Sequence, residues 1–206
     1  SDLLNVLGML GLSFYILADT FFVSRALGAD GLTALNLAIP IYSFIHGSGL
    51  MLGIGGGTKY SILRSQKNKV KANQAFTNAV VLTGIIAGIF FLLGMFCSGP
   101  MVSMLGAHES VFEMTKTYLQ VILLFAPMFM TNNLLLCFIR NDGNPQLSMT
   151  AMICGSLSNV ILDYIFIFPL GMGLFEAAFA TGLAPVISIL ILSPYLVKKR
   201  NQFHLK

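Results

Sequence analysis

Long apolar stretches alternate with short polar connections along the whole chain. Six stretches each approach or exceed the roughly 20 residues that a helix needs to cross the hydrocarbon of a bilayer. Their apolar runs are continuous rather than alternating, which favours helices over the strands of a β-barrel. The connections carry helix breakers such as Gly99-Pro100 and Asp142-Gly143-Asn144-Pro145. The pattern predicts an all-α membrane protein with six transmembrane helices, over residues 3–23, 35–60, 76–97, 118–139, 147–168 and 175–197.

Composition agrees with this fold class and narrows the function. Of the 206 residues, 56% are hydrophobic and 10% are charged, whereas soluble domains carry about 25% charged residues. The recurring spans exclude a signal peptide followed by a soluble domain. The sequence has no Ser–His–Asp set, no metal motif and no soluble portion large enough for an active site, so we expect neither an enzyme nor a cofactor. The cysteines Cys97, Cys137 and Cys154 have no metal-ligand spacing and are interpreted as packing residues.

Basic residues are concentrated in alternate connections and predict the orientation of the spans. Only Arg25 and Lys116 fall on one side, and the other ten of the 12 Lys and Arg fall on the opposite side. Because cytoplasmic loops carry an excess of Lys and Arg, both termini of this segment are predicted to be cytoplasmic. Basic residues beside membrane spans do not indicate a nucleic-acid partner. The ten are Lys59, Arg64, Lys67, Lys69, Lys71, Arg140, Lys198, Lys199, Arg200 and Lys206.

Two aspartates, Asp19 and Asp163, lie inside apolar spans. A carboxylate at membrane depth is costly and persists where it faces a bundle interior or a wet cavity, so an ion or proton site is the default interpretation. The alternative is a polar pair that only joins helices. That alternative usually needs a nearby cation, and neither segment contains Lys or Arg.

Matching depths place two further oxygen-bearing residues near these aspartates. In the predicted orientation Asp19, Asp163 and Thr181 fall at a similar depth on three helices. Asn159 precedes Asp163 by four residues and therefore shares its helical face. Two carboxylates, an amide oxygen and a hydroxyl suit a proton or a small hard cation such as Na⁺.

Other motifs favour structural roles. Gly49, Gly53 and Gly57 lie on one helical face, where small residues let helices approach closely. The stretch GIGGGTKYS over residues 53–61 lacks the spacing and the preceding strand of a phosphate-binding loop. His46 could relay protons, but a satisfied structural histidine is the favoured interpretation.

Four short motifs, in this order, resemble the multidrug and toxic compound extrusion (MATE) transporters, and the bacterial members in particular. The stretch ADTFFVSRALGADGLTAL (18–35) resembles their first helix and outer loop, and FIRNDGNP (138–145) resembles their fourth-to-fifth loop. The residues NVILD (159–163) and ATG (180–182) resemble their fifth and sixth helices.

This resemblance implies a twelve-helix fold of two six-helix lobes, in which residues 1–206 form the amino-terminal lobe and the carboxy-terminal lobe is absent. It implies H⁺- or Na⁺-coupled antiport of organic, often cationic, drugs across a bacterial cytoplasmic (inner) membrane. The implied partners are small-molecule drugs, membrane lipid and the carboxy-terminal lobe. The implied cation site comprises Asp19, Asn159, Asp163 and Thr181, and the implied substrate cavity comprises Tyr15, Asn133, Met152 and Ser156.

Two other functions stay open at this point. One is a flippase for a lipid-linked or polysaccharide precursor from the same superfamily, which a basic cavity would favour. The other is a non-transporting subunit of a membrane assembly. The segment before Asp19 contains no proline, which argues against the first-helix bending that is tied to protonation in some members of the family.

Overall fold

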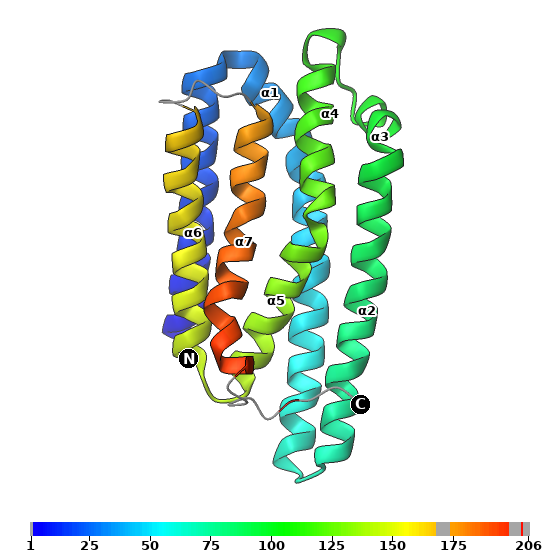
Figure 1. The fold of residues 1–206 in the computed structure, drawn as a ribbon, viewed down its shortest axis with the longest axis vertical. Coiled ribbons are helices and arrows are strands. Elements are labelled where there is room, and N and C mark those ends of the chain that lie inside the picture. The colour runs from blue at the N-terminus through cyan, green and yellow to red at the C-terminus, as the bar shows by residue number, and fades with distance from the viewer. Residues whose placement is uncertain (1, 168–173, 198–202, 204–206) are drawn as a thin grey trace.

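A computed structural model describes residues 2–167, 174–197 and 203. Side chains are described from Leu17 onward within these ranges, except at Ala18, Asp19, Ala26, Ile167, Leu174 and Val197. The described residues form helices without strands, so the predicted all-α fold is confirmed (Figure 1). The helices are α1 (Asp2–Ser65), α2 (Lys69–Phe96), α3 (Ser98–Met104), α4 (Glu109–Leu124), α5 (Ala126–Asn141), α6 (Pro145–Ile167) and α7 (Leu174–Val197).

Helix boundaries differ from the predicted ranges in several places, among them the start of α2 at Lys69 rather than at Phe76. The first two predicted helices join in α1 and are separated by one non-helical residue, Gly28 (φ 72°, ψ −154°). Glycine tolerates this positive φ because it has no Cβ. The fourth predicted span begins at Glu109 rather than at Tyr118, and α4 and α5 meet at a 45° bend. The short helix α3 was not predicted.

Four described helical segments are long and apolar enough to cross a membrane, and the bent α4–α5 pair adds a fifth. Pro127 in the first turn of α5 explains the break in that pair, since it has no N–H for the carbonyl four residues earlier. The side chains of the first predicted span lie largely outside the described residues. The four segments are Leu27–Ser65, Lys69–Phe96, Pro145–Phe166 and Phe175–Leu196.

The turn between α1 and α2 and the turn between α5 and α6 lie at the same end of the bundle (Figure 1). We call this the basic end, because Arg64, Lys67 and Arg140 lie in or beside these turns. In the second turn Gly143 adopts φ 96°, and the side chain of Asn144 accepts a hydrogen bond from the backbone N–H of Leu147. This cap, followed by proline at the first helical position, starts α6 sharply.

Packing of α1 against α5 depends on the glycine face predicted from the sequence. A Cβ built on Gly49 would lie 3.2 Å from the Cα of Met130, and one on Gly53 would lie 3.1 Å from the carbonyl oxygen of Asn133. These approaches are tighter than ordinary van der Waals contact, so only glycine fits without displacement. The predicted packing role of the glycines is confirmed, and it brings the second half of α1 against α5.

Candidate functional site: buried oxygens between α6 and α7

Three of the four residues predicted to bind a cation have described side chains, and all three are buried. Asn159 and Asp163 on α6 are 0% exposed, and Thr181 on α7 is 3% exposed. The hydroxyl of Thr181 donates to the carbonyl oxygen of Ala177 at 3.1 Å, which leaves the lone pairs of its oxygen available. The three side chains are therefore buried as the sequence predicted.

Close contact between α6 and α7 fixes which residues face each other. A Cβ built on Gly155 would lie 3.0 Å from the carbonyl oxygen of Ala184 and 3.4 Å from the Cβ of Ser188. The two helices run in opposite directions (Figure 1). Moving one turn away from the basic end on each helix places Asn159 level with Ala180 and Thr181. Asp163 lies one further turn away on the same face of α6.

The first half of α1 packs against α6 at this level. The ring of Phe22 meets the ring of Tyr164 edge-on, with centroids 6.2 Å apart. Both helices begin at the basic end and run away from it (Figure 1). The backbone of Asp19 lies about one turn before Phe22 and so falls between the levels of Asn159 and Asp163. The side chain of Asp19 lies outside the described residues.

The electrostatic setting of the site is acidic. Asp163 is the only charged residue of α6, and Glu176 is the only charged residue of α7. The described residues contain no group of three His, Cys, Asp or Glu side chains placed to hold a metal ion together. The oxygens of a carboxylate, an amide and a hydroxyl instead match the ligands that protons and hard monovalent cations accept.

Three of the four residues predicted to line the substrate cavity have described side chains. Asn133 is buried between α1 and α5, where its Nδ2 atom lies 3.3 Å from Nδ1 of His46 and donates to the carbonyl oxygen of His46 at 3.4 Å. His46 therefore has a polar partner, and its ring also stacks on Tyr42, in line with the structural role predicted for it. Asn133 thus occupies a helix contact.

The other three predicted cavity residues are divided between α1 and α6. Met152 and Ser156 on α6 are half-buried, and Met152 packs against an apolar cluster near the basic end. The side chain of Tyr15 lies outside the described residues. The assignment of these residues to a substrate cavity stays a prediction.

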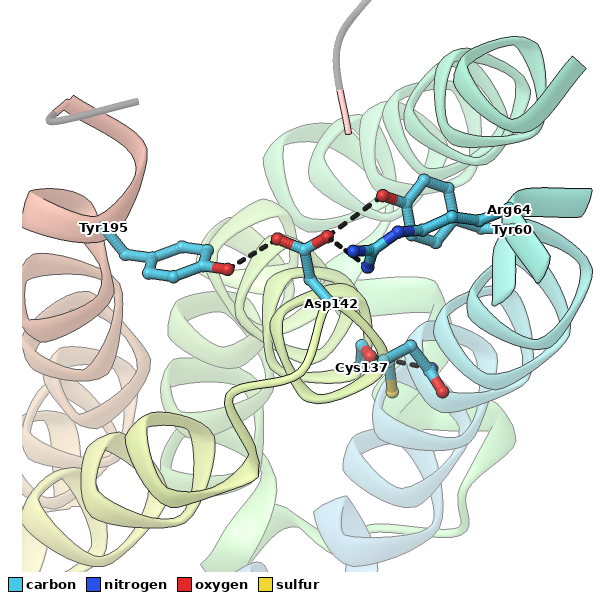
Figure 2. Close-up of polar contacts among 6 residues, drawn as sticks. Tyr60, Arg64, Cys137, Asp142 and Tyr195 are labelled. Carbon is cyan, nitrogen blue, oxygen red and sulfur yellow. Dashed lines mark hydrogen bonds and ion pairs between the residues drawn. The ribbon is translucent and has the colours of Figure 1, made fainter. Parts of the chain in front are cut away.

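A second buried aspartate, which the sequence did not single out, organises the basic end. Asp142 accepts hydrogen bonds at Oδ1 from the hydroxyl of Tyr60 at 3.0 Å and from Nη1 of Arg64 at 3.1 Å (Figure 2). Its Oδ2 accepts from the hydroxyl of Tyr195 at 2.5 Å. We call these four residues the Asp142 cluster. The cluster ties the ends of α1, α5 and α7 together.

Burial distinguishes the Asp142 cluster from a surface ion pair. The side chain of Asp142 is 0% exposed, and that of Arg64 is 35% exposed. Three donors to one buried carboxylate meet the requirement that buried charges be paired and hydrogen-bonded. The sequence feature that could have indicated this cluster is the pair Tyr60 and Arg64, which lie one helical turn apart at the end of a span. Their partner was interpreted only as part of a loop breaker.

Comparisons with known proteins place this arrangement in a transporter family. The sequence pattern of the MatE family matches residues 6–165. The chain is 30% identical over 197 residues to the multidrug export protein MepA of Staphylococcus saprophyticus, and 28% identical to MepA of Staphylococcus aureus strain MRSA252. In both cases the match covers 95% of this chain and 44% of the relative.

Solved structures show the same relation in three dimensions. A crystal structure of MATE in complex with MaD3S superimposes with a TM-score of 0.90 at 28% identity, over 97% of this chain and 45% of that chain. A MOP superfamily transporter from Pyrococcus furiosus, described as having a binding pocket of reverse polarity, superimposes with a TM-score of 0.88 at 28% identity, over 97% of this chain and 44% of that one. This chain thus spans less than half the length of these proteins. It belongs to the MatE family of transporters and corresponds to the amino-terminal lobe of their fold.

Proposed function

We propose that this lobe belongs to an antiporter that exports organic, often cationic, drugs and is driven by inward movement of H⁺ or Na⁺. The observation that carries the proposal is the burial of Asp163 and Asn159 inside α6, at the level of Thr181 on α7, in helices that contain no Lys or Arg. A carboxylate at membrane depth requires a proton, a cation or a polar cavity to offset its loss of hydration. A coupling ion supplies that compensation reversibly.

The four oxygen-bearing residues would bind the coupling ion together. Asp19 and Asp163 would provide negative charge, and Asn159 and Thr181 would provide neutral oxygens. A proton needs one carboxylate, whereas a dehydrated Na⁺ needs several oxygen ligands. The neutral oxygens therefore favour a site in which Na⁺ is able to bind.

Coupling follows from alternating occupancy of the lobe by ion and drug. Each positive charge that moves inward across the membrane releases about 2.3 kcal/mol per 100 mV, in addition to its concentration term. Ion binding would displace the drug on the outer side, and ion release would restore the drug-binding state on the inner side. Rocking against the carboxy-terminal lobe would alternate access, as in other transporters built from repeats.

The orientation proposed for the lobe places the basic end in the cytoplasm. Arg64, Lys67 and Arg140 lie at this end, whereas Arg25 lies in α1 just before the break at Gly28 and Lys116 lies in α4 near Gly99 of α3. A cytoplasmic excess of Lys and Arg is the strongest sequence determinant of membrane orientation. The lobe would then lie in a bacterial cytoplasmic membrane in contact with lipid, with both termini of this segment inside.

The reverse polarity of the binding pocket in one structural neighbour is described as suggesting a different function for that transporter, so the polarity of the lobe bears on its cargo. A flippase for anionic lipid-linked precursors would require basic groups inside the lobe. The only charged residues of α6 and α7 are acidic. The chemistry of this lobe therefore favours cations over anionic lipid precursors.

The proposal is tested with the transporter that contains this lobe, reconstituted in proteoliposomes. Efflux of a fluorescent organic cation is measured under an imposed Na⁺ gradient with the proton gradient collapsed, and separately under a proton gradient alone. Efflux under either gradient that is lost in both Asp19→Asn and Asp163→Asn supports the proposal and identifies the ion. Gradient-driven efflux that persists in both variants would overturn it.

A further inference from the structure

Two buried polar side chains at the α6–α7 contact have no hydrogen-bond partner in the described part of the chain. They are Asn159, through both Oδ1 and Nδ2, and Ser188, through Oγ. They are 0% and 1% exposed. More than about nine in ten buried polar groups in folded proteins are paired with protein or with ordered water. Both residues therefore require a partner.

Ser188 lies against Gly155 of α6, one helical turn from Asn159. The Cβ of Ser188 lies 3.4 Å from the position of a Cβ on Gly155, which places Ser188 directly against α6. Asn159 follows Gly155 by four residues and so occupies the same face, one turn further from the basic end. One group placed between these two turns can reach both side chains.

A third polar group at this level of α7 is left without its usual helical donor by Pro185. Proline has no backbone N–H, so the carbonyl oxygen of Thr181 lacks the donor that a helix normally supplies four residues later. Helical carbonyls point toward the C-terminus, and this one therefore points from Thr181 toward the level of Ala184. That is the level at which α7 meets Gly155.

We propose that one water molecule is held between Asn159, Ser188 and the carbonyl oxygen of Thr181. Buried waters typically make about three hydrogen bonds to otherwise unpaired groups, which is the number available here. The water accepts from Nδ2 of Asn159 and from the hydroxyl of Ser188, and it donates to the carbonyl oxygen of Thr181. A water fits this set because it can accept from two donors and donate to a carbonyl oxygen at the same time.

This site acts on transport by fixing the orientation of the Asn159 amide. With Nδ2 bound to the water, Oδ1 of Asn159 is directed away from it and is available to the coupling ion. Ser188 is then a positioning residue, which affects ion affinity without touching the ion. This role rests on the proposed function, whereas the water site itself does not.

Ser188→Ala tests the role, with Ser193→Ala as the matched control. Ser193 is on the same helix, and its hydroxyl donates to the carbonyl oxygen of Leu190 at 2.9 Å, away from this interface. Loss of about one net hydrogen bond should raise the ion concentration for half-maximal efflux about fivefold in Ser188→Ala, with an unchanged maximal rate. Ser193→Ala should leave both values unchanged. Equal ion dependence in the two variants, or a lower maximal rate alone, would overturn the role of Ser188.

A high-resolution structure of the transporter tests the water site independently of activity. Solvent density within hydrogen-bonding distance of all three groups, and its loss in Ser188→Val, is the expected result. A direct hydrogen bond from Ser188 to the backbone, without solvent, would overturn the site. Measuring ion coupling in Asp163→Asn separates the proposed function from the water site. Retained ion coupling in that variant refutes the proposed function. The water site is decided by the solvent density alone.

Discussion

Two buried aspartates in this lobe have opposite surroundings. Asp142 at the basic end accepts hydrogen bonds from three side chains of the described residues, one of them an arginine. Asp163 lies in a helix without a basic residue, one turn from an amide whose polar atoms have no partner in the described part of the chain. A carboxylate neutralised by Arg64 has no need of an exchangeable cation. Burial of an aspartate alone thus does not distinguish an ion site from a structural ion pair. The distinction depends on whether a basic side chain, such as Arg64 at Asp142, neutralises the carboxylate.

The largest contrast is expected in transport. Asp163→Asn should abolish gradient-driven efflux, with a loss of more than about 100-fold, because an amide cannot replace the charge that the proposed function assigns to ion binding. Asp142→Asn should retain efflux and an unchanged ion dependence. Both variants are assayed in proteoliposomes at matched protein content. A comparable loss of ion dependence in Asp142→Asn would remove the distinction between the two aspartates.

Stability should change in the reverse order. Asp142→Asn removes the charged acceptor of two hydroxyls and a guanidinium, and it should lower the free energy of unfolding by about 2–3 kcal/mol. Asp163→Asn removes a buried charge from an apolar helix and should leave that free energy unchanged or raise it. Denaturation of the purified variants in detergent measures both values. A larger loss in Asp163→Asn would indicate a structural ion pair at that residue.

Packing beside the Asp142 cluster should matter to a smaller degree. Gly53→Ala places a Cβ 2.9 Å from the sulfur of Cys137 and 3.1 Å from a backbone oxygen, and should cost about 1–2 kcal/mol of unfolding free energy. Gly55→Ala is the matched control, since nothing lies within 4 Å of its Cβ. This control should be neutral or stabilising, because alanine favours helix. Equal effects of the two substitutions would mean that the α1–α5 contact is looser than described.

The smallest effect is expected from a single hydroxyl. Tyr195→Phe removes one of three donors to Asp142 and keeps the ring, so it should cost about 1 kcal/mol of unfolding free energy. A double-mutant cycle with Asp142→Asn isolates the coupling between the two residues. Additive effects in that cycle would show that this hydrogen bond contributes nothing measurable to stability.

The apolar pattern predicted the helical class, because helix formation depends on residues that are neighbours along the chain, and the cost of a carboxylate at membrane depth predicted that Asp163 faces the interior. The break at Gly28 was predicted as a longer loop, since glycine spacing indicates a turn without fixing its length. The bend between α4 and α5 lies at Pro127, a proline inside the predicted fourth span, where the chain lacks a backbone donor. Sequence patterns indicate that a helix break or bend is present but do not fix the residue at which it occurs.

The Asp142 cluster could not be found in this way. Asp142 is 82 residues from Tyr60, 78 from Arg64 and 53 from Tyr195. No periodicity of the sequence relates residues so far apart. The motif DGNP is explained by its turn alone and gives no sign of a buried carboxylate. The unpartnered Ser188 was equally invisible, because its surroundings depend on which face of α7 meets Gly155.

These separations also set an order of events during synthesis. Tyr60 and Arg64 are translated early, Asp142 follows at the end of α5, and Tyr195 is translated only with the last helix described. Until then Asp142 lacks the donor that Tyr195 supplies, and the end of α7 is not joined to this carboxylate. The basic end of the lobe can therefore close only after the last of these helices has been translated and inserted, which makes it a natural checkpoint for complete folding.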